Sequence, residues 1–146
     1  MAHHRATRAE INLKAFKQYL QNLKIILGSS TGIMAVIKAD AYGHGALASA
    51  RAAVESGIDY LGAGVIEEGI ELRKNGIENP ILILGSIFPD EVADLVHHNL
   101  STIICTPYLA EVLSSEAKKQ GKVINIHIKV DTGMNRLGVL PENLLS

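Results

Sequence analysis

The spacing of apolar residues changes several times along the chain, and each change marks an expected structural element. In residues 11–27, Ile11, Phe16 and Leu20 share one helical face with the leucines that follow, until the sequence GSSTG interrupts the pattern. We therefore expect an amphipathic helix over 11–27, ahead of the rest of the fold.

Downstream, short runs rich in Val, Ile and Leu alternate with segments of helical spacing. The runs lack a regular apolar and polar alternation, which is typical of strands buried on both faces of a sheet. The order predicts an α/β fold with a parallel sheet built from βαβ units. The expected strands are 33–39, 59–65, 80–86, 101–106 and 123–133, and the expected helices between them are 45–57, 66–76, 89–99 and 107–121.

Glycine and proline support these helix boundaries. Gly57, Gly76 and Gly121 each follow a helical stretch, where the closing residue takes a left-handed conformation that glycine adopts without strain. Pro89 lies where a first helical turn tolerates proline. No repeat, low-complexity segment or linker divides the chain, so we expect one structural unit.

Two architectures have this order of elements, an open doubly wound sheet and a (β/α) barrel. A dinucleotide-binding doubly wound fold normally carries G-x-G-x-x-G after a strand; here Gly62 and Gly64 have the spacing, but Glu67 replaces the third glycine. The barrel is therefore favoured. A complete (β/α)8 barrel of the TIM type needs about 250 residues. We expect these 146 residues to form its first part, four strand–helix units and a fifth strand, with open sheet edges.

Composition narrows the class of partner. The chain is 47% hydrophobic, and 14 basic against 15 acidic residues leave a net charge of -1. This balance gives no electrostatic footprint for nucleic acid or an anionic membrane, so a small molecule is the expected ligand. Cys105 is the only cysteine, and we find neither a secretory signal nor an apolar run of about 18 residues. We interpret the protein as cytoplasmic.

Candidate chemistry centres on Lys38, at the end of the expected strand 33–39. In a parallel barrel the carboxyl ends of the strands form the open mouth, where catalytic side chains lie. Partial burial there favours a neutral amine, which can attack an aldehyde. Gly43 and Gly45 let the backbone turn, and the next helix offers N–H groups to a phosphate or carboxylate. Position alone also fits an ordinary surface lysine.

Three segments resemble one enzyme family in both order and placement. They are RAEINLKAFKQYLQNL near the start, AVIKADAYGHGA around Lys38 and IKVDTGMNRLGV near the end. Together they closely resemble the alanine racemases, which bind pyridoxal 5'-phosphate (PLP) in a (β/α) barrel. The resemblance runs from Arg8 to Val139. It implies an isomerase that interconverts L-alanine and D-alanine and supplies D-alanine for peptidoglycan.

The resemblance gives roles to specific residues. Lys38 matches the lysine that forms a Schiff base with PLP and acts as one of two acid/base groups. Tyr42 matches the tyrosine beside the cofactor phosphate, and Arg136 matches the arginine that contacts the phenolic oxygen of PLP and the substrate carboxylate. Lys129 matches a lysine that is often carbamylated, whose negative charge would hold Arg136. Asn135 departs from the usual glycine, although asparagine tolerates a left-handed backbone.

The resemblance also implies parts that this chain lacks. The second acid/base group is a tyrosine from the C-terminal β domain of the partner subunit in a homodimer. We therefore expect 1–146 to be a partial barrel domain that lacks the C-terminal β domain and half of the active site, and is inactive by itself. The chain's own tyrosines stand in no matching motif for that role: Tyr19, Tyr42, Tyr60 and Tyr108.

Other interpretations remain open from the sequence. A PLP-binding barrel of the same fold without racemase activity, serving cofactor homeostasis, and a racemase of another amino acid such as serine both fit. We expect no metal site, because His97 and His98 are adjacent and point about 100° apart on a helix. The charges of the expected helix 66–76 run from acidic to basic, which suits a helix dipole and needs no acid/base role.

Overall fold

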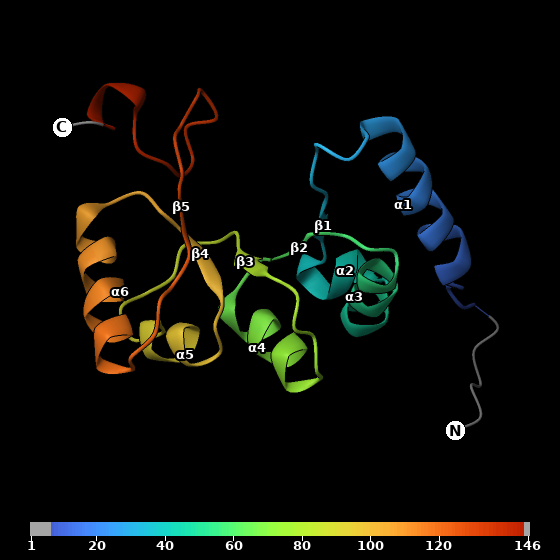
Figure 1. Cartoon of the computed structure of the whole chain (residues 1–146), viewed down its shortest axis with the longest axis horizontal. Helices are drawn as coiled ribbons and strands as arrows, with labels where there is room; N and C mark the ends of the chain where they lie inside the picture. The colour runs from blue at the N-terminus through green and yellow to red at the C-terminus, as the bar shows by residue number, and fades with distance from the viewer. Residues whose placement is uncertain (1–6, 145–146) are drawn as a thin grey trace.

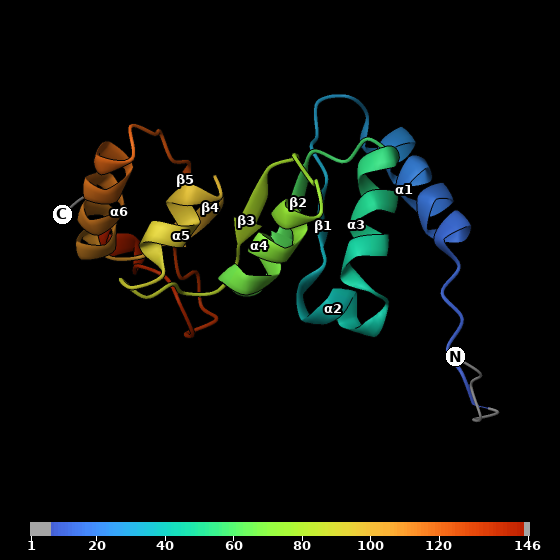
Figure 2. The ribbon, with the colours of Figure 1, turned by 90° about the horizontal axis from the view of Figure 1, so that it is seen from below.

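A computed structural model describes residues 7–144 and contains one parallel sheet with the strand order β1-β2-β3-β4-β5 (Figures 1 and 2). The strands are β1 (Met34–Val36), β2 (Tyr60–Ala63), β3 (Ile81–Ile83), β4 (Ser101–Ile104) and β5 (Ile126–Ile128). The helices are α1 (Leu13–Leu27), α2 (Lys38–Gly43), α3 (Ala46–Glu55), α4 (Ile66–Lys74), α5 (Val92–His97) and α6 (Pro107–Lys119), followed by the 3-10 turn η1 (Pro141–Asn143).

The strand order confirms the predicted α/β fold. Each strand pairs in parallel with the next one along the chain, for example Ala35 with Leu61 and Leu61 with Ile81. A barrel grows in this sequential way, whereas a doubly wound sheet reverses its strand order. The structure is therefore the first part of a barrel. This agrees with the absence of the third glycine of G-x-G-x-x-G from the sequence.

The core lies between the sheet and the helices that follow its outer side. Leu61, Ile81 and Ile83 from the strands are fully buried, and they pack with Leu72 of α4 and Leu95 of α5. In Figure 1, α3, α4, α5 and α6 follow one side of a curved sheet. Within the described residues no helix covers the opposite side between α1 and the C-terminal segment.

That uncovered side has exposed apolar residues on the two outermost strands. Met34 and Val36 of β1 and Ile126 and Ile128 of β5 are all exposed. Residues that face the inside of a closed barrel would be buried by the remaining strands. The exposure therefore matches the open edges that the chain length predicted.

Several predicted boundaries differ from the structure by one to several residues. The helix expected over 89–99 begins only at Val92, because the side chain of Glu91 accepts a hydrogen bond from the Phe88 N–H (2.5 Å) and closes a turn there. The strand expected over 33–39 ends at Val36, and the one expected over 123–133 covers only Ile126–Ile128. A strand extends only as far as the strand it pairs with. The partner of β5 is β4, which has just four residues.

The helix ends follow the predicted chemistry. Gly57, Gly76 and Gly121 have φ values of +74°, +82° and +62°, the left-handed region expected for closing glycines. At its start, α1 is capped by the Asn12 side chain, which accepts a hydrogen bond from the Ala15 N–H. No helix in residues 7–144 is both long and apolar enough to cross a membrane.

Candidate functional site

The carboxyl ends of all five parallel strands meet at one edge of the sheet. Pairing continues a residue or two past the strands there, through hydrogen bonds from Ile37 N–H to Gly62 C=O (2.8 Å) and from Lys129 N–H to Ile104 C=O (2.8 Å). In Figure 2, α2 and the C-terminal loop extend toward the same side of the sheet, low in the view. Lys38 and Lys129 therefore both lie just beyond a strand on this edge.

Lys38 begins the short helical turn α2, two residues after β1, and is half-buried. This corrects the prediction that it ends a strand over 33–39. The four residues from Ala39 to Tyr42 all have φ between +51° and +56°, so the backbone makes one left-handed turn. Left-handed helical geometry costs L-residues roughly 1–2 kcal/mol each. The segment with the candidate amine is therefore strained and needs outside support.

The left-handed turn is held by hydrogen bonds at both of its ends. Ala41 N–H donates to the Ile37 carbonyl (2.8 Å), and Gly45 N–H donates to the Asp40 carbonyl (3.0 Å). From outside the turn, the carboxylate of Glu68 on α4 accepts a hydrogen bond from the Ala39 N–H (2.7 Å). Backbone strain persists where the surroundings over-determine it, as here.

After the turn, two glycines lead the chain into α3. Gly43 and Gly45 have φ values of +84° and +91°, so the predicted sharp turn is present. The side chain of Asp40 accepts a hydrogen bond from Ala46 N–H (2.6 Å), the first residue of α3. One of the N–H groups expected to suit a phosphate or carboxylate is therefore already taken by the protein's own carboxylate.

Tyr42 shares the turn with Lys38. The Lys38 Nζ lies 6.0 Å from the centroid of the Tyr42 ring, at the outer limit of a cation–π contact. The Tyr42 side chain is 61% exposed, so its hydroxyl is accessible to a ligand. A primary amine and a phenol thus come together on one short segment at the carboxyl edge of the sheet.

Two glycines make room beside Lys38. A Cβ at Gly64 would lie 3.2 Å from the Lys38 Cβ, tighter than ordinary contact, so the lysine stem packs directly over the backbone at the end of β2. A Cβ at Gly85 would lie 2.5 Å from the Gly64 carbonyl oxygen. Gly85 therefore has no room for a side chain against the end of β2, and a Cβ at Gly64 would press on the Lys38 stem.

The segment that contains Arg136 is a tight loop closed at its base. Asp131 N–H donates to Val139 C=O (2.8 Å), and Val139 N–H donates to Lys129 C=O (2.8 Å). Inside the loop the Asp131 carboxylate accepts hydrogen bonds from the N–H groups of Gly133 (2.9 Å) and Asn135 (3.1 Å). These two bonds, with a smaller contribution from the positive charge of Lys129, lower the pKa of Asp131.

Asn135 takes the left-handed conformation that its place in the loop requires, with φ of +54°. This confirms the expectation that asparagine tolerates a left-handed backbone here. Arg136 is exposed, and in residues 7–144 its guanidinium makes no hydrogen bond or ion pair. Lys129 is half-buried, directly after β5.

The four sequence-predicted residues form two separate pairs. Lys38 and Tyr42 follow β1, while Lys129 and Arg136 follow β5, and these are the two outermost strands of the sheet. At about 4.8 Å per strand, four spacings separate the pairs by roughly 20 Å along the sheet. In a barrel of eight strands the first and the fifth face each other across the mouth. Of these two pairs, only Lys38 and Tyr42 come close to each other in the structure.

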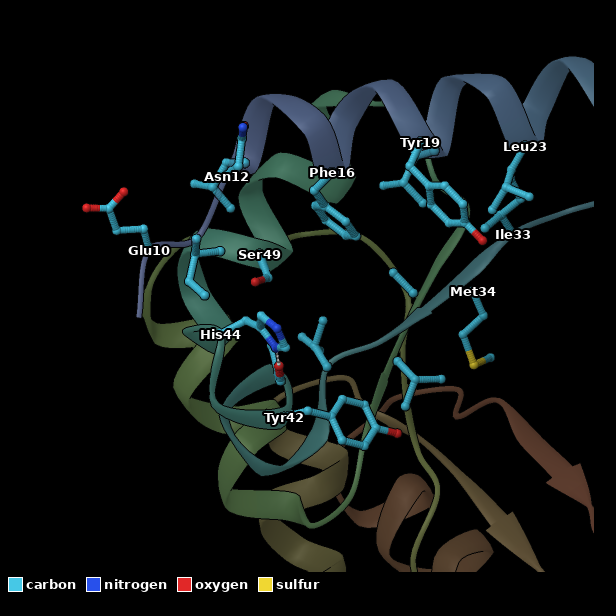
Figure 3. A pocket seen from close by; sticks show the side chains of 17 residues that line it. Glu10, Asn12, Phe16, Tyr19, Leu23, Ile33, Met34, Tyr42, His44 and Ser49 are labelled. Atoms are coloured by element: carbon cyan, nitrogen blue, oxygen red, sulfur yellow. Dashed lines mark hydrogen bonds between the residues drawn. The ribbon is translucent and has the colours of Figure 1, made fainter. Parts of the chain in front are cut away.

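One cavity lies beside Tyr42, and Lys38 is not among the residues that line it. It has a volume of about 570 Å³ and lies between α1 and the open edge of β1. Figure 3 shows Phe16 and Tyr19 of α1 on one side and Tyr42 and His44 on the other, with the His44 ring hydrogen-bonded to the Ala41 carbonyl (2.7 Å). We attribute this cavity to the unpaired edge of β1, since α1 covers that edge incompletely.

Among the remaining candidates, none forms a second chemical centre in the described part of the chain. His127 on β5 makes an edge-to-face contact with the ring of Tyr60, and Cys105 after β4 is half-buried. Within residues 7–144 no three His, Cys, Asp or Glu side chains gather in a way that could hold a metal ion.

Sequence reasoning missed one residue of this site. From the sequence, the acidic residues of α4 have no acid/base role, yet the Glu68 carboxylate contacts the turn of Lys38 and also accepts a hydrogen bond from Gly64 N–H (2.7 Å). Glu68 is the third residue of α4, the position from which an acidic side chain reaches back to the residues before the helix. That capping pattern is the signal that could have identified it.

Comparisons with known proteins give a consistent family. A family model described as "Alanine racemase, N-terminal domain" matches residues 11–146. The chain is 44% identical over 128 residues to the alanine racemase of Synechocystis sp., covering 87% of this chain and 32% of that protein. It is 43% identical over 141 residues to alanine racemase 1 of Bacillus subtilis, covering 95% of this chain and 35% of that protein.

Solved structures agree with the sequence relatives. The alanine racemase of Clostridium difficile 630 superposes with a TM-score of 0.83 at 37% identity, over 89% of this chain and 33% of that one. The enzyme from Bacillus anthracis with bound L-Ala-P superposes with a TM-score of 0.78 at 28% identity, over 88% and 33%. The chain thus spans about a third of the length of the relatives that it matches.

Proposed function

Because the chain belongs to the alanine racemase family, as its N-terminal domain, we propose that it provides one part of a PLP-dependent active site that interconverts L-alanine and D-alanine. Residues 1–146 would be a partial barrel domain, of which 7–144 are described. The C-terminal β domain and the second acid/base tyrosine would come from outside this chain, the tyrosine from a partner subunit in a homodimer.

The described residues fit the aldehyde cofactor in their chemistry. A half-buried primary amine and an accessible phenol lie on one turn, with the Lys38 Nζ 6.0 Å from the Tyr42 ring. Lys38 would hold PLP through its aldehyde carbon, and the Tyr42 hydroxyl would donate to a phosphate oxygen. When bound, PLP supplies an electron sink for the negative charge left at the substrate Cα. The remaining phosphate ligands would come from other strands.

Each residue then has a defined task at a defined atom. The Lys38 amine takes up or returns the Cα proton on one face of the substrate, and a tyrosine of the partner subunit exchanges it on the other. Arg136 would hold the substrate carboxylate and the phenolic oxygen of PLP, since a guanidinium offers paired donors to oxygen anions. A carbamylated Lys129 would orient Arg136 by a charge-assisted hydrogen bond.

The observation that carries this proposal is the strained turn around Lys38. A left-handed turn of four residues other than glycine is costly, and it persists here directly after the candidate amine, anchored from a second helix. An ordinary surface lysine needs no such support. The protein therefore fixes the direction of this side chain at the expense of stability.

The test is racemisation by the intact protein. With PLP added, it should convert L-alanine to D-alanine, and Lys38→Ala should reduce kcat by at least about 1000-fold, as expected for loss of both the covalent anchor and a proton carrier. Chiral chromatography of the product measures both. Lys14→Ala on the exposed face of α1 is the matched control and should retain activity.

The result also separates racemase activity from cofactor storage. A protein that only holds PLP would bind the cofactor but would exchange no Cα proton of alanine for deuterium in heavy water. Absence of that exchange in the loaded intact protein would contradict the proposed activity. Exchange with serine in preference to alanine would reassign the substrate.

A further inference from the structure

Glu68 joins two strand ends through a single carboxylate. Its Oε1 accepts the hydrogen bond from Ala39 N–H, after β1, and its Oε2 accepts the one from Gly64 N–H, after β2, each at 2.7 Å. Both donors are backbone groups at the carboxyl edge of the sheet. A carboxylate has an acceptor oxygen for each of them and carries the charge that shortens and strengthens such bonds.

The two donors lie on either side of Lys38. Ala39 is the next residue in the chain and the first of the left-handed run. Gly64 lies under the lysine stem, since a Cβ there would be 3.2 Å from the Lys38 Cβ and 3.3 Å from the Glu68 Oε2. The carboxylate therefore fixes both the backbone that carries the amine and the surface on which its stem rests.

Few other bonds resist rotation of the first peptide of the turn. The remaining bonds of the turn involve donors further along the chain, namely the N–H groups of Ala41, His44, Gly45 and Ala46 and the ring of His44. Without the Glu68 bond, the peptide after Lys38 is free to relax toward the right-handed region that L-residues prefer. Such a relaxation would swing the Cα–Cβ bond of Lys38 and redirect its amine.

We propose that Glu68 is a positioning residue that aims the Lys38 amine by clamping Ala39 and Gly64. This inference rests on the function proposed for Lys38. Glu68 itself touches neither the substrate nor the cofactor in this account. It acts through the backbone, and its role is to keep the strained turn in place while the amine exchanges partners and protons.

The variants follow from the geometry of the clamp. Glu68→Ala removes both acceptors, while Glu68→Gln keeps one acceptor oxygen and points an N–H₂ group at the other N–H donor. Glu67→Ala is the matched control, because Glu67 is the exposed neighbour in the same first turn of α4 and its side chain forms no hydrogen bond with the Lys38 turn. Both positions lie in the first turn of the same helix, so dipole effects are similar.

The first measurement is amide hydrogen exchange in the intact protein without added PLP. Glu68→Ala should speed exchange at Ala39 and Gly64 by about tenfold or more, as expected for the loss of a charge-assisted hydrogen bond. Exchange at buried strand residues such as Leu61 should stay unchanged. Glu67→Ala should leave all of these rates as they are. Unchanged protection of Ala39 and Gly64 in Glu68→Ala would overturn the clamp.

The second measurement is the reaction of the intact protein with PLP and then with alanine. Glu68→Ala and Glu68→Gln should attach PLP to Lys38 about tenfold more slowly and lose kcat by a similar factor, with little change in KM for alanine. The pH profile of kcat should also shift in both variants and not in Glu67→Ala, because the amine changes its surroundings.

The outcomes separate this inference from the proposed function. If the wild-type protein attaches no PLP at Lys38, the proposed function fails, and the positioning role fails with it. If the wild-type protein attaches PLP and racemises alanine while Glu68→Ala and Glu68→Gln match Glu67→Ala in rate and pH profile, only the positioning role is overturned.

Discussion

A single carboxylate, that of Asp131, shapes the loop that presents Arg136. It accepts hydrogen bonds from the N–H groups of Gly133 and Asn135, and these bonds hold the pKa of Asp131 below its usual range. A carboxyl group with a depressed folded-state pKa stabilises the fold fully above its unfolded pKa of about 3.9. That stabilisation is lost as the pH falls through the lower folded-state pKa.

We therefore predict that the loop loosens only in acid, below the usual pKa range of an aspartate. The carboxyl carbon shift of Asp131 and the amide shifts of Gly133 and Asn135, followed by NMR as the pH is lowered, should titrate together. Asp131→Asn should show loosened loop amides already at neutral pH. Titration of Asp131 at an ordinary aspartate pKa, with the two amide shifts unaffected, would contradict this account.

At the residue scale, the sequence proposed the candidate residues and missed one that supports them. Lys38 and Tyr42 are candidates because they stand in one short motif, and the structure places them on one turn. The left-handed backbone of Asn135 could be predicted because it is a local property. Glu68 was missed because its partners, Ala39 and Gly64, are 29 and four positions away in the chain. The place of Glu68 in the first turn of α4 could have indicated the bond to Gly64, whereas the bond to Ala39 depends on the fold and leaves no trace in local spacing.

Between elements, Arg73 at the end of α4 ties two loops together. Its guanidinium donates to the carbonyl oxygens of Ile77 (2.7 Å) and Asn79 (2.7 Å), which lead into β3, and of His98 (3.1 Å) and Asn99 (3.1 Å), which lead into β4. Burial lowers the pKa of Arg73, and the negative charge of Glu78 opposes that shift. One side chain thus satisfies four carbonyls on the amino-terminal side of the sheet.

Arg73→Met should lower the free energy of unfolding by about 2 kcal/mol, since the carbonyls lose a charged donor while the apolar stem is kept. Urea unfolding of the intact protein measures the change. Arg51→Met is the control, because the Arg51 side chain donates a single long bond, 3.5 Å, to Asn75 C=O; it should change the stability by less than about 0.5 kcal/mol. Equal effects of the two substitutions would contradict the role of Arg73.

The sequence pattern predicted most elements correctly, but it missed α2 and made β5 too long. Apolar spacing found every strand and every helix longer than six residues, since burial repeats with the period of the element. It missed α2, because a left-handed turn of Ala39, Asp40, Ala41 and Tyr42 has no apolar period and depends on support from α4. It overestimated β5, whose length is limited by the four residues of β4.

For the whole molecule, the open sheet explains why the two pairs of site residues lie apart. Lys38 and Tyr42 follow β1, Lys129 and Arg136 follow β5, and every strand runs in the same direction. Closing the sheet into a barrel turns these opposite ends of one edge toward each other across a shared mouth. The sequence predicted this class of fold from strand order and length, but it could not place the two pairs relative to each other.

The most direct measurement is the position at which PLP attaches to the intact protein. Both Lys38 and Lys129 present an amine at the carboxyl edge of the sheet, and only Lys38 lies on a turn with a phenol and an anchoring carboxylate. After incubation with PLP and reduction with borohydride, peptide mapping by mass spectrometry identifies the labelled lysine. We predict the reduced adduct on Lys38; an adduct on Lys129 instead, or on no lysine of this edge, would contradict the account.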